Sequence, residues 1–389
     1  MTDPSHNIPD GRGHIPGLDG LRGIAVILVL IHHLVLSKEL GWNPAISGWV
    51  HTGWIGVDLF FVLSGFLITG ILVDAKGNKG YFKTFYMRRF LRIFPLYYAA
   101  IFVMLVLLPL VAGLLGLDQR FPAGFSSLEK TSDAQLWLWL YLQNYVAANY
   151  SMFNHFWSLA VEEHFYLFWP LLVYFLPRRA MLAACVVVIV LAFALRVVDE
   201  HLYNLPGNPY QATHARMDAL ALGGLIAMLF RRPGGWASAR KWALSAMLIG
   251  GALMLAYAVT QHGIGHKKPI ERTVGFTVIA FFFGGVITWI VAHRPGEGAT
   301  RWLLVKPLTE LGKIGYGMYV FHRLLMFPLG IILPADKALA ITGNRYAAGL
   351  LWLACAVILT LIVATLSWRF FEAPILKLKK HFPYDKRTA

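Results

Sequence analysis

The sequence predicts an all-α, polytopic membrane protein with about ten transmembrane helices. Of its 389 residues, 57% are hydrophobic and only 14% are charged, whereas about 25% of the residues of an ordinary soluble domain are charged. The mean hydropathy of +0.58 agrees with this class. Apolar segments recur at lengths near the roughly 20 residues that a helix needs to cross a bilayer. They lie at about 22–37, 53–73, 93–116, 156–176, 180–197, 214–230, 242–260, 272–293, 308–333 and 346–368.

The positive charges predict the topology of these segments. The net charge is +15, but Lys and Arg gather in short stretches between the apolar runs, which indicates membrane topology rather than nucleic-acid binding. With the N-terminus in the cytoplasm, the inner segments hold 23 Lys and Arg residues and the outer segments hold 9. Cytoplasmic loops collect positive charge, so we expect both termini in the cytoplasm and the protein in the cell inner membrane.

Three regions are expected along the chain: a cytoplasmic N-terminal segment (1–20), an integral membrane domain (21–370) and a basic cytoplasmic tail (371–389). The apolar run 24–36 is as short as the core of a signal peptide. No small-residue cleavage site follows it closely, so we interpret it as a retained first helix.

Two further features refine this organisation. The aromatic run Leu136–Leu142 is expected to form a short re-entrant or interfacial piece on the outer side, because Trp and Tyr favour the headgroup layer. The two cysteines, Cys185 and Cys355, lie inside apolar runs. Their small number and their location exclude a disulfide framework, a CxxC redox pair and a thiolate zinc site.

The first apolar segment carries an unusual set of polar residues. It opens with a charged, glycine-broken turn from Asp19 and ends in His32 and His33. Eleven helical residues turn through about 1100°, so Arg22 and His33 share one face about 16 Å apart, while His32 points about 80° away. A positive-inside arginine with two interfacial histidines explains the same pattern equally well.

Charged and hydroxyl side chains also interrupt the second and third segments. A charge in hydrocarbon costs several kcal/mol unless it is paired or hydrated, so Asp58 is a candidate for a polar interior. Ser64 is either a covalent nucleophile or, as the pattern favours, a serine at a close helix contact. Arg89 and Arg92, three residues apart on one face, suit a bidentate phosphate clamp or an anchor in anionic lipid.

Two adjacent carboxylates, Glu162 and Glu163, lie in an apolar, aromatic span. Burying both as charges is costly, so we expect them to face a cation, a wet cavity or hydroxyl groups. For Arg216, Asp218 and His322, which also lie in apolar segments, interhelix salt bridges or hydrogen bonds are the favoured roles.

Taken together and in this order, the motifs resemble those of the acyltransferase family 3 membrane proteins. Two positions depart from the family pattern: His164 stands where Gln is common, and Ala160 where Ser is common. A fused periplasmic esterase-like domain, found in some members, is not expected. The matching stretches are Leu18–Gly23 with Arg22 and His33, Gly56–Phe66, Arg89–Pro95, Trp157–Tyr166, Arg216–Leu220, Tyr319–His322 and Phe371–Pro374.

The resemblance implies transfer of an acyl group, usually acetyl from acetyl-CoA, to a hydroxyl of a cell-envelope or secreted glycan such as lipopolysaccharide O-antigen or exopolysaccharide. His33 corresponds to the catalytic histidine, with Glu162 and Glu163 beside it. No metal is expected. The donor-binding residues are Arg22, Arg89 and Arg92, and the supporting or acceptor-site residues are Asp19, Asp58, Ser64, Ser158, Tyr166, Arg216, Asp218 and His322.

Physical chemistry is compatible with this division of labour. An imidazole suits a base near neutral pH, and the CoA phosphates would meet the cytoplasmic arginines. The pantetheine arm would cover the roughly 16 Å to His33. Glu162 or Glu163 would orient the imidazole, as in a triad, or bind acceptor hydroxyls. Whether His33 acts as a base or is itself acylated stays open.

Two other classes of protein use similar residues. A transporter or flippase could employ the buried His and Glu side chains as a proton relay. That class predicts internal repeats and matching broken helices, and the sequence has neither in convincing form. A binding or scaffold function would not explain why the arginine cluster and the Glu pair are present.

Overall fold

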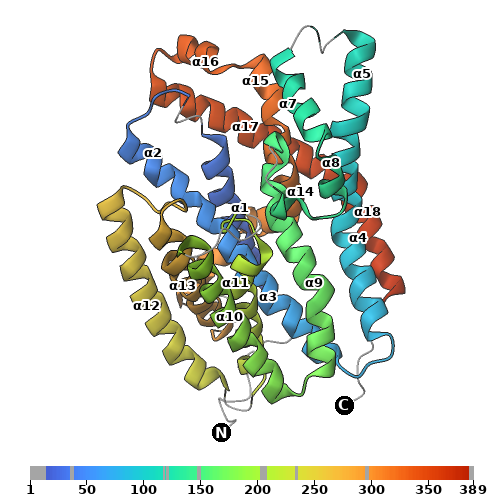
Figure 1. Ribbon diagram of the computed structural model, residues 1–389, viewed down its shortest axis with the longest axis vertical. Helices are drawn as coiled ribbons and strands as arrows, with labels where there is room; N and C mark the ends of the chain where they lie inside the picture. Colours follow the sequence, from blue (N-terminus) through green and yellow to red (C-terminus); the bar gives the residue numbers. More distant parts are fainter. Residues whose placement is uncertain are drawn as a thin grey trace.

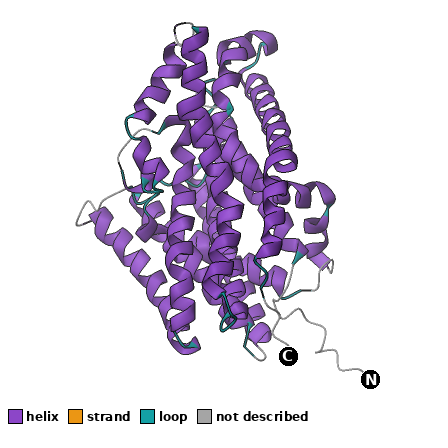
Figure 2. Ribbon diagram, turned by 90° about the vertical axis from the view of Figure 1, so that its right-hand side faces the viewer, coloured by secondary structure: helices purple, strands orange, loops and turns teal. Residues whose placement is uncertain are grey.

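The protein is a bundle of helices in the computed structural model, which describes residues 15–35, 39–116, 119, 122–146, 150–201, 208–232, 235–293 and 298–384. Within these ranges the regular secondary structure is entirely helical (Figures 1 and 2). Most of the predicted N-terminal segment 1–20, and residues 385–389 of the predicted tail, lie outside the described residues.

Each of the ten predicted apolar segments overlaps a long helix. The long helices are α1 (Pro16–Leu34), α3 (Gly56–Ala75), α4 (Tyr81–Phe102), α9 (Trp157–Phe175), α10 (Arg178–His201), α11 (Thr213–Phe230), α12 (Gly235–Gln261), α13 (Phe276–Val291), α14 (Lys306–Leu324) and α17 (Arg345–Ser367). The short helices are α2 (Pro44–His51), α5 (Leu108–Leu115), α7 (Pro122–Ser132), α8 (Gln135–Trp139), α15 (Met326–Ile332), α16 (Ala335–Thr342) and α18 (Ala373–Leu376).

Seven helical sections of the described chain are long and apolar enough to cross a membrane. The predicted segments that fall outside this set are those of α9, α11 and α14, which carry Glu162, Glu163, Arg216, Asp218 and His322 among the ionisable residues noted above. The protein is therefore a multi-pass membrane protein. The count of about ten spans, and the side of the membrane that the termini face, stay predictions. The seven sections are Pro16–Leu34, Pro44–Ala75, Tyr81–Leu115, Arg178–Glu200, Arg240–Gln261, Glu271–Val291 and Arg345–His381.

The helices divide into a buried centre and an apolar periphery. The most apolar stretch of α3 is 72% buried, whereas that of α12 is 17% buried. Figure 1 shows α3, α9 and α11 in the middle of the molecule and α12 at one edge. The outer helices expose many large aliphatic side chains, among them Leu248, Leu255 and Val187. Such surfaces suit contact with lipid, because a helix satisfies its own backbone hydrogen bonds.

The first helix corrects one expectation, since the stretch from Asp19 is helical and not a turn. Pro16 occupies the first turn of α1, where its missing N–H costs nothing. The glycines serve close packing instead. A Cβ atom at Gly20 would lie 2.0 Å from the carbonyl oxygen of Leu303, and one at Gly23 would lie 2.3 Å from that of Leu308. Small residues therefore bring α1 against α14 and the turn before it.

The predicted span 308–333 is broken in two, which corrects a second expectation. Helix α14 ends at Leu324, and α15 begins at Met326. Pro328 has no N–H to donate to the carbonyl of Leu324, so the helical ladder is interrupted at that point.

The aromatic run 136–142 does not form a long helix. Only α8 forms there, and it packs on α4: the Tyr97 and Tyr98 hydroxyls donate to the carbonyl oxygens of Leu138 and Trp139 at 2.8 and 3.0 Å. This confirms a short piece rather than a span, and its location on the outer side stays a prediction.

The predicted tail is packed against the bundle over its described part. The helix of α17 continues through a π-helical turn (Trp368–Glu372) and α18 into a 3-10 turn (Lys377–His381). Arg88 of α4 donates to the carbonyl oxygens of Lys379 and Phe382 at 3.2 and 2.8 Å. The tail is thereby fixed beside α4.

A glycine substitution tests the close contact of α1. We expect Gly20→Ala to destabilise the protein by about 1–3 kcal/mol, because the new methyl group overlaps a backbone carbonyl that cannot rotate away. Thermal unfolding in detergent measures the effect. Gly113→Ala is the matched control, since a Cβ atom there meets nothing within 4 Å. An equal melting temperature for the two variants would contradict the packing role.

Candidate active site

A cavity of about 420 Å³, lined by both apolar and charged side chains, lies between α1, α3, α4, α9 and α14. Its wall also includes Trp368 and Lys379, which follow α17. The cavity brings together residues predicted separately from four stretches of sequence. They are Asp19, Arg22, Ser64, Arg89, Arg92, Ser158, Glu162, Glu163 and Tyr166.

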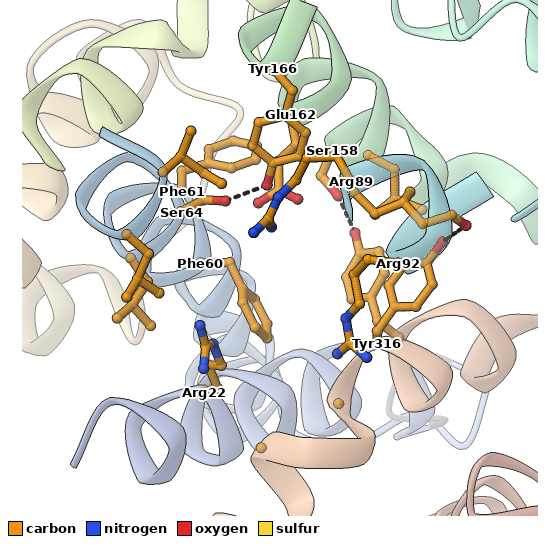
Figure 3. Close-up of a pocket in the computed structure, with 18 of the residues that line it drawn as sticks. Arg22, Phe60, Phe61, Ser64, Arg89, Arg92, Ser158, Glu162, Tyr166 and Tyr316 are labelled. Atoms are coloured by element: carbon orange, nitrogen blue, oxygen red, sulfur yellow. Dashed lines mark hydrogen bonds between the residues drawn. The ribbon is translucent and has the colours of Figure 1, made fainter. Parts of the chain in front are cut away.

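Three guanidinium groups converge on this cavity (Figure 3). Arg22 forms a salt bridge with Asp19 three residues earlier on α1. Arg92 lies 3.9 Å from the Glu372 carboxylate, a loose pairing. Arg89 forms no salt bridge with any described residue, and its buried Nε has no hydrogen-bond partner among them. The cluster therefore has unsatisfied positive charge that an anionic group can neutralise.

Aromatic rings form part of the same wall. The Arg92 guanidinium lies 5.7 Å from the ring centre of Tyr316 and 5.5 Å from that of Trp368. Arg89 lies 5.9 Å from the ring centre of Tyr166. Cation–π contacts of this kind hold a guanidinium in place without consuming its N–H donors. The donors of both arginines remain available to a ligand.

The Glu pair faces hydroxyl groups and the cavity, as its apolar surroundings predicted. Glu162 hydrogen bonds with Ser64 and Tyr166, whose hydroxyl oxygens are themselves 2.5 Å apart. Glu163 also lines the cavity, and its buried Oε1 has no hydrogen-bond partner among the described residues. Ser64 belongs to this network, whereas the close contact of α3 with α11 is made by Gly65.

At one end, the cavity adjoins a cluster of histidines. Ser158 and Tyr319 line the cavity and hydrogen bond to each other. The Tyr319 hydroxyl also donates to the carbonyl oxygen of His155 at 2.8 Å. The His155 ring centre lies 4.6 Å from that of His322 and 6.5 Å from that of His33. Ser158 and Tyr319 thus separate the arginine cavity from the predicted catalytic histidine.

His33 pairs with His322 and with neither glutamate. Its Nδ1 lies 3.1 Å from Nε2 of His322, and Nδ1 of His322 lies 2.7 Å from the carbonyl oxygen of Tyr319. A carbonyl only accepts, so Nδ1 of His322 carries a proton. In neutral rings, Nε2 of His322 then accepts from Nδ1–H of His33. Nε2 of His33 is left with a free lone pair.

This pairing departs from the expectation that Glu162 or Glu163 orients His33. Within the described ranges, the Glu162 hydrogen bonds go to Ser64 and Tyr166 and the His33 hydrogen bond goes to His322. The physical reason is the helix arrangement. Helix α14 packs along α1, so its His322 lies closer to His33 than the glutamates of α9 do.

His32 faces away from His33's partner, as helix geometry predicted. Its Nδ1 donates to the carbonyl oxygen of His51 at 2.7 Å. Its ring also lies beside His266, in the loop before α13, at 6.5 Å between ring centres. Burial lowers the pKa of His266 to about 4, so this neighbouring imidazole is neutral at pH 7.

Three predicted supporting residues lie outside the cavity wall in buried ion pairs. Arg216 of α11 donates to Asp58 of α3 at 2.7 Å, and both side chains are almost inaccessible. Arg196 of α10 pairs with Asp218 of α11 at 2.8 Å. The Arg216 guanidinium also lies 4.0 Å from the ring centre of Phe276. These contacts match the favoured structural roles of Arg216 and Asp218.

Sequence reasoning assigned no role to four residues near this site: His155, Arg196, Tyr319 and Lys379. Arg196 and His155 carried a usable signal, since an ionisable side chain next to or inside an apolar run is a candidate by default. Tyr319 begins the family stretch Tyr319–His322, which marked its position but not its role. Lys379 carried no signal, because lysine is common at the cytoplasmic ends of membrane segments.

Comparison with known proteins connects this geometry to a family. A family model described as an acyltransferase domain matches residues 15–369. YrhL of Bacillus subtilis, provisionally named as a peptidoglycan O-acetyltransferase, is 32% identical over 382 aligned residues, which cover 93% of this chain and 55% of YrhL. The peptidoglycan O-acetyltransferase OatA of Listeria monocytogenes is 31% identical over 386 residues, covering 94% of this chain and 56% of OatA.

A third relative is the O-acetyltransferase OatA of Staphylococcus aureus, 28% identical over 389 aligned residues that cover 94% of this chain and 57% of that protein. The chain thus spans about half the length of these curated relatives. No solved structure matches the chain.

A substitution that removes one charge tests the structural role of the buried Asp58–Arg216 pair. Asp58→Asn leaves Arg216 buried without a counter-charge, so we expect a loss of about 3–5 kcal/mol of stability. The matched control is Asp74→Asn, where the carboxylate that pairs with Arg231 is 38% exposed, and a loss of at most about 1 kcal/mol is expected. Thermal unfolding in detergent compares them; equal losses would contradict the structural assignment.

Proposed function

Because the chain belongs to the acyltransferase family whose model matches residues 15–369, we propose that it transfers an acetyl group from acetyl-CoA to a hydroxyl of a cell-envelope glycan. The observation that carries this proposal is the cavity itself. It brings Arg22 of α1 together with Arg89 and Arg92 of α4, and it ends at Tyr319, one helical turn from the partner of His33. One end suits an anionic donor, and the other adjoins a base.

The donor end is suited to the phosphates of CoA. Arg89 and Arg92 have N–H donors that are not committed to buried carboxylates, and guanidinium groups bind phosphate in bidentate fashion. CoA is cytoplasmic, so this proposal places the arginines toward the cytoplasm and the protein in the cell inner membrane. The pantetheine arm would run along α1, over the roughly 16 Å that separate Arg22 from His33 on a continuous helix.

His33 is the proposed base. The hydrogen bonds through His322 favour the tautomer in which Nε2 of His33 is unprotonated. In the proposed reaction, Nε2 takes the proton of the acceptor hydroxyl as its oxygen attacks the thioester carbonyl. The C–S bond of the tetrahedral intermediate then breaks, and the thiolate of CoA takes the proton back from His33. His322 holds the imidazole in this tautomer, a positioning role like that of the third member of a triad.

The proposed acceptor is a glycan hydroxyl outside the cytoplasm. Two relatives carry names that specify peptidoglycan, so a peptidoglycan hydroxyl is the first acceptor to test. Lipopolysaccharide O-antigen and exopolysaccharide, both expected from the sequence resemblance, are the second and third. Comparing the O-acetyl content of each envelope glycan in cells with and without the protein identifies the acceptor.

Activity of purified variants tests the role of His33. With labelled acetyl-CoA, we expect His33→Ala to lose about 10²–10⁴-fold in acetyl transfer and hydrolysis, the usual contribution of a general base. His322→Ala should lower kcat more than it changes KM, and His322→Gln, which keeps one donor and one acceptor, should recover part of it. His32→Gln is the control and should stay near wild type. Wild-type rates in His33→Ala would contradict the proposal.

Binding of CoA tests the donor end separately. Arg89→Ala and Arg92→Ala should each weaken CoA binding by about tenfold or more, since a charge-assisted hydrogen bond contributes about 1.5–3 kcal/mol. The dependence of the affinity on salt should also become weaker. Arg369→Ala removes an exposed cation outside the cavity wall and serves as the control. An unchanged CoA affinity in both cavity variants would exclude this cavity as the donor site.

A further inference from the structure

A lysine from the C-terminal tail reaches the arginine cavity. Lys379 lies in the 3-10 turn Lys377–His381 and lines the cavity together with Arg22, Arg89 and Arg92. Its sequence neighbours Leu378 and Lys380 are exposed, whereas Lys379 is partly buried. The turn therefore directs one of its lysines inward and leaves the next in solvent or at the membrane surface.

The backbone around Lys379 is held by α4 through contacts that no family motif predicted. Arg88 donates to the carbonyl oxygens of Lys379 and Phe382 at 3.2 and 2.8 Å. The Arg88 guanidinium also lies 5.1 Å from the ring centre of Tyr384, and the Thr84 hydroxyl donates to the carbonyl of Pro383 at 3.4 Å. Arg88 does not line the cavity, so its contacts fix the tail beside it.

The charges around Lys379 are predominantly positive. Its electrostatic neighbours are Arg89, Arg92 and Arg88, and no carboxylate among the described residues forms a salt bridge with it. Glu372, the acidic side chain of the described part of the tail, is paired with Arg92 at 3.9 Å. Cations held together repel one another, and the repulsion is relieved when an anion binds among them.

We propose that Lys379, positioned by Arg88, completes a phosphate-binding site at the mouth of the cavity with Arg89 and Arg92. The inference rests on the proposed function, because the phosphate is assigned to the CoA donor. Lysine contributes a compact charge with three donors, which complements the flat, bidentate guanidinium groups. In this arrangement the tail, packed on α4, adds Lys379 to the part of the donor site that Arg89 and Arg92 of α4 line.

The phosphate of an anionic lipid headgroup has the same chemistry as that of CoA. The test therefore uses protein in nanodiscs of purely zwitterionic lipid, with CoA and pantetheine as the two probes. Pantetheine lacks the phosphates, so it reports on the arm of the donor alone. A parallel set of nanodiscs containing phosphatidylglycerol measures retention of anionic lipid.

We expect Lys379→Gln to weaken CoA binding by about tenfold and to leave pantetheine binding unchanged. Lys380→Gln, the exposed neighbour, should bind both probes as wild type does. Arg88→Gln should weaken CoA binding as Lys379→Gln does, although Arg88 does not line the cavity. This result distinguishes a tail that is positioned by Arg88 from a chance contact.

Three results would overturn the inference. The first is a CoA affinity of Lys379→Gln equal to that of Lys380→Gln. The second is an equal loss of CoA and pantetheine binding, which indicates local unfolding. The third is unchanged CoA binding with weaker retention of phosphatidylglycerol, which assigns the site to lipid. If Arg89→Ala lowers the CoA affinity and Lys379→Gln does not, only this inference fails. If wild type binds no CoA, the proposed function itself fails.

Discussion

The cost of placing charged groups inside a membrane governs this structure. Three of the helices that carry ionisable residues of the interior, α9, α11 and α14, are the long helices that lack the apolar character of a spanning segment. They are tolerable in the interior because their charges are paired, as in Arg216 with Asp58, or open into a cavity, as in Glu162. The apolar helices α10, α12 and α17 surround them and present aliphatic side chains outward.

Within this frame, the arginine cavity and the adjoining histidine cluster are two chemically different ends of one polar interior. The arginine end holds Arg22, Arg89 and Arg92, of which Arg89 forms no salt bridge with a described residue, and the histidine end holds imidazole rings that hydrogen bond to one another and to backbone carbonyls. Ser158 and Tyr319 lie between the two ends.

Close packing of α1 against α14 sets the relative position of the two ends. Glycines on α1 bring its backbone to within van der Waals distance of backbone carbonyls near α14, where a methyl group would overlap. The approach aligns His33 with His322. Packing and chemistry are therefore linked, since a small shift of α1 against α14 changes both the contact at Gly20 and the hydrogen bond that orients His33.

Much of the local structure follows from the sequence alone. The ten apolar segments predicted the long helices, because hydrophobic length is a local property of the chain. The shared face of Arg22 and His33 followed from helix periodicity, and the need of Glu162 for hydroxyl or cationic neighbours followed from the cost of burial. The family motifs pointed to the acyltransferase assignment, which the match over residues 15–369 confirms.

Only the tertiary structure decided which of these residues meet. His33 is paired with a histidine 289 positions away rather than with the glutamates, Asp58 with an arginine 158 positions away, and Lys379 joins a cavity built mainly from other helices. Such pairings depend on which helices become neighbours and how closely their backbones approach. Hydrophobic periodicity predicts that each helix has a buried face, but every apolar helix offers similar faces, so the choice of partner is made by the packing of the whole bundle.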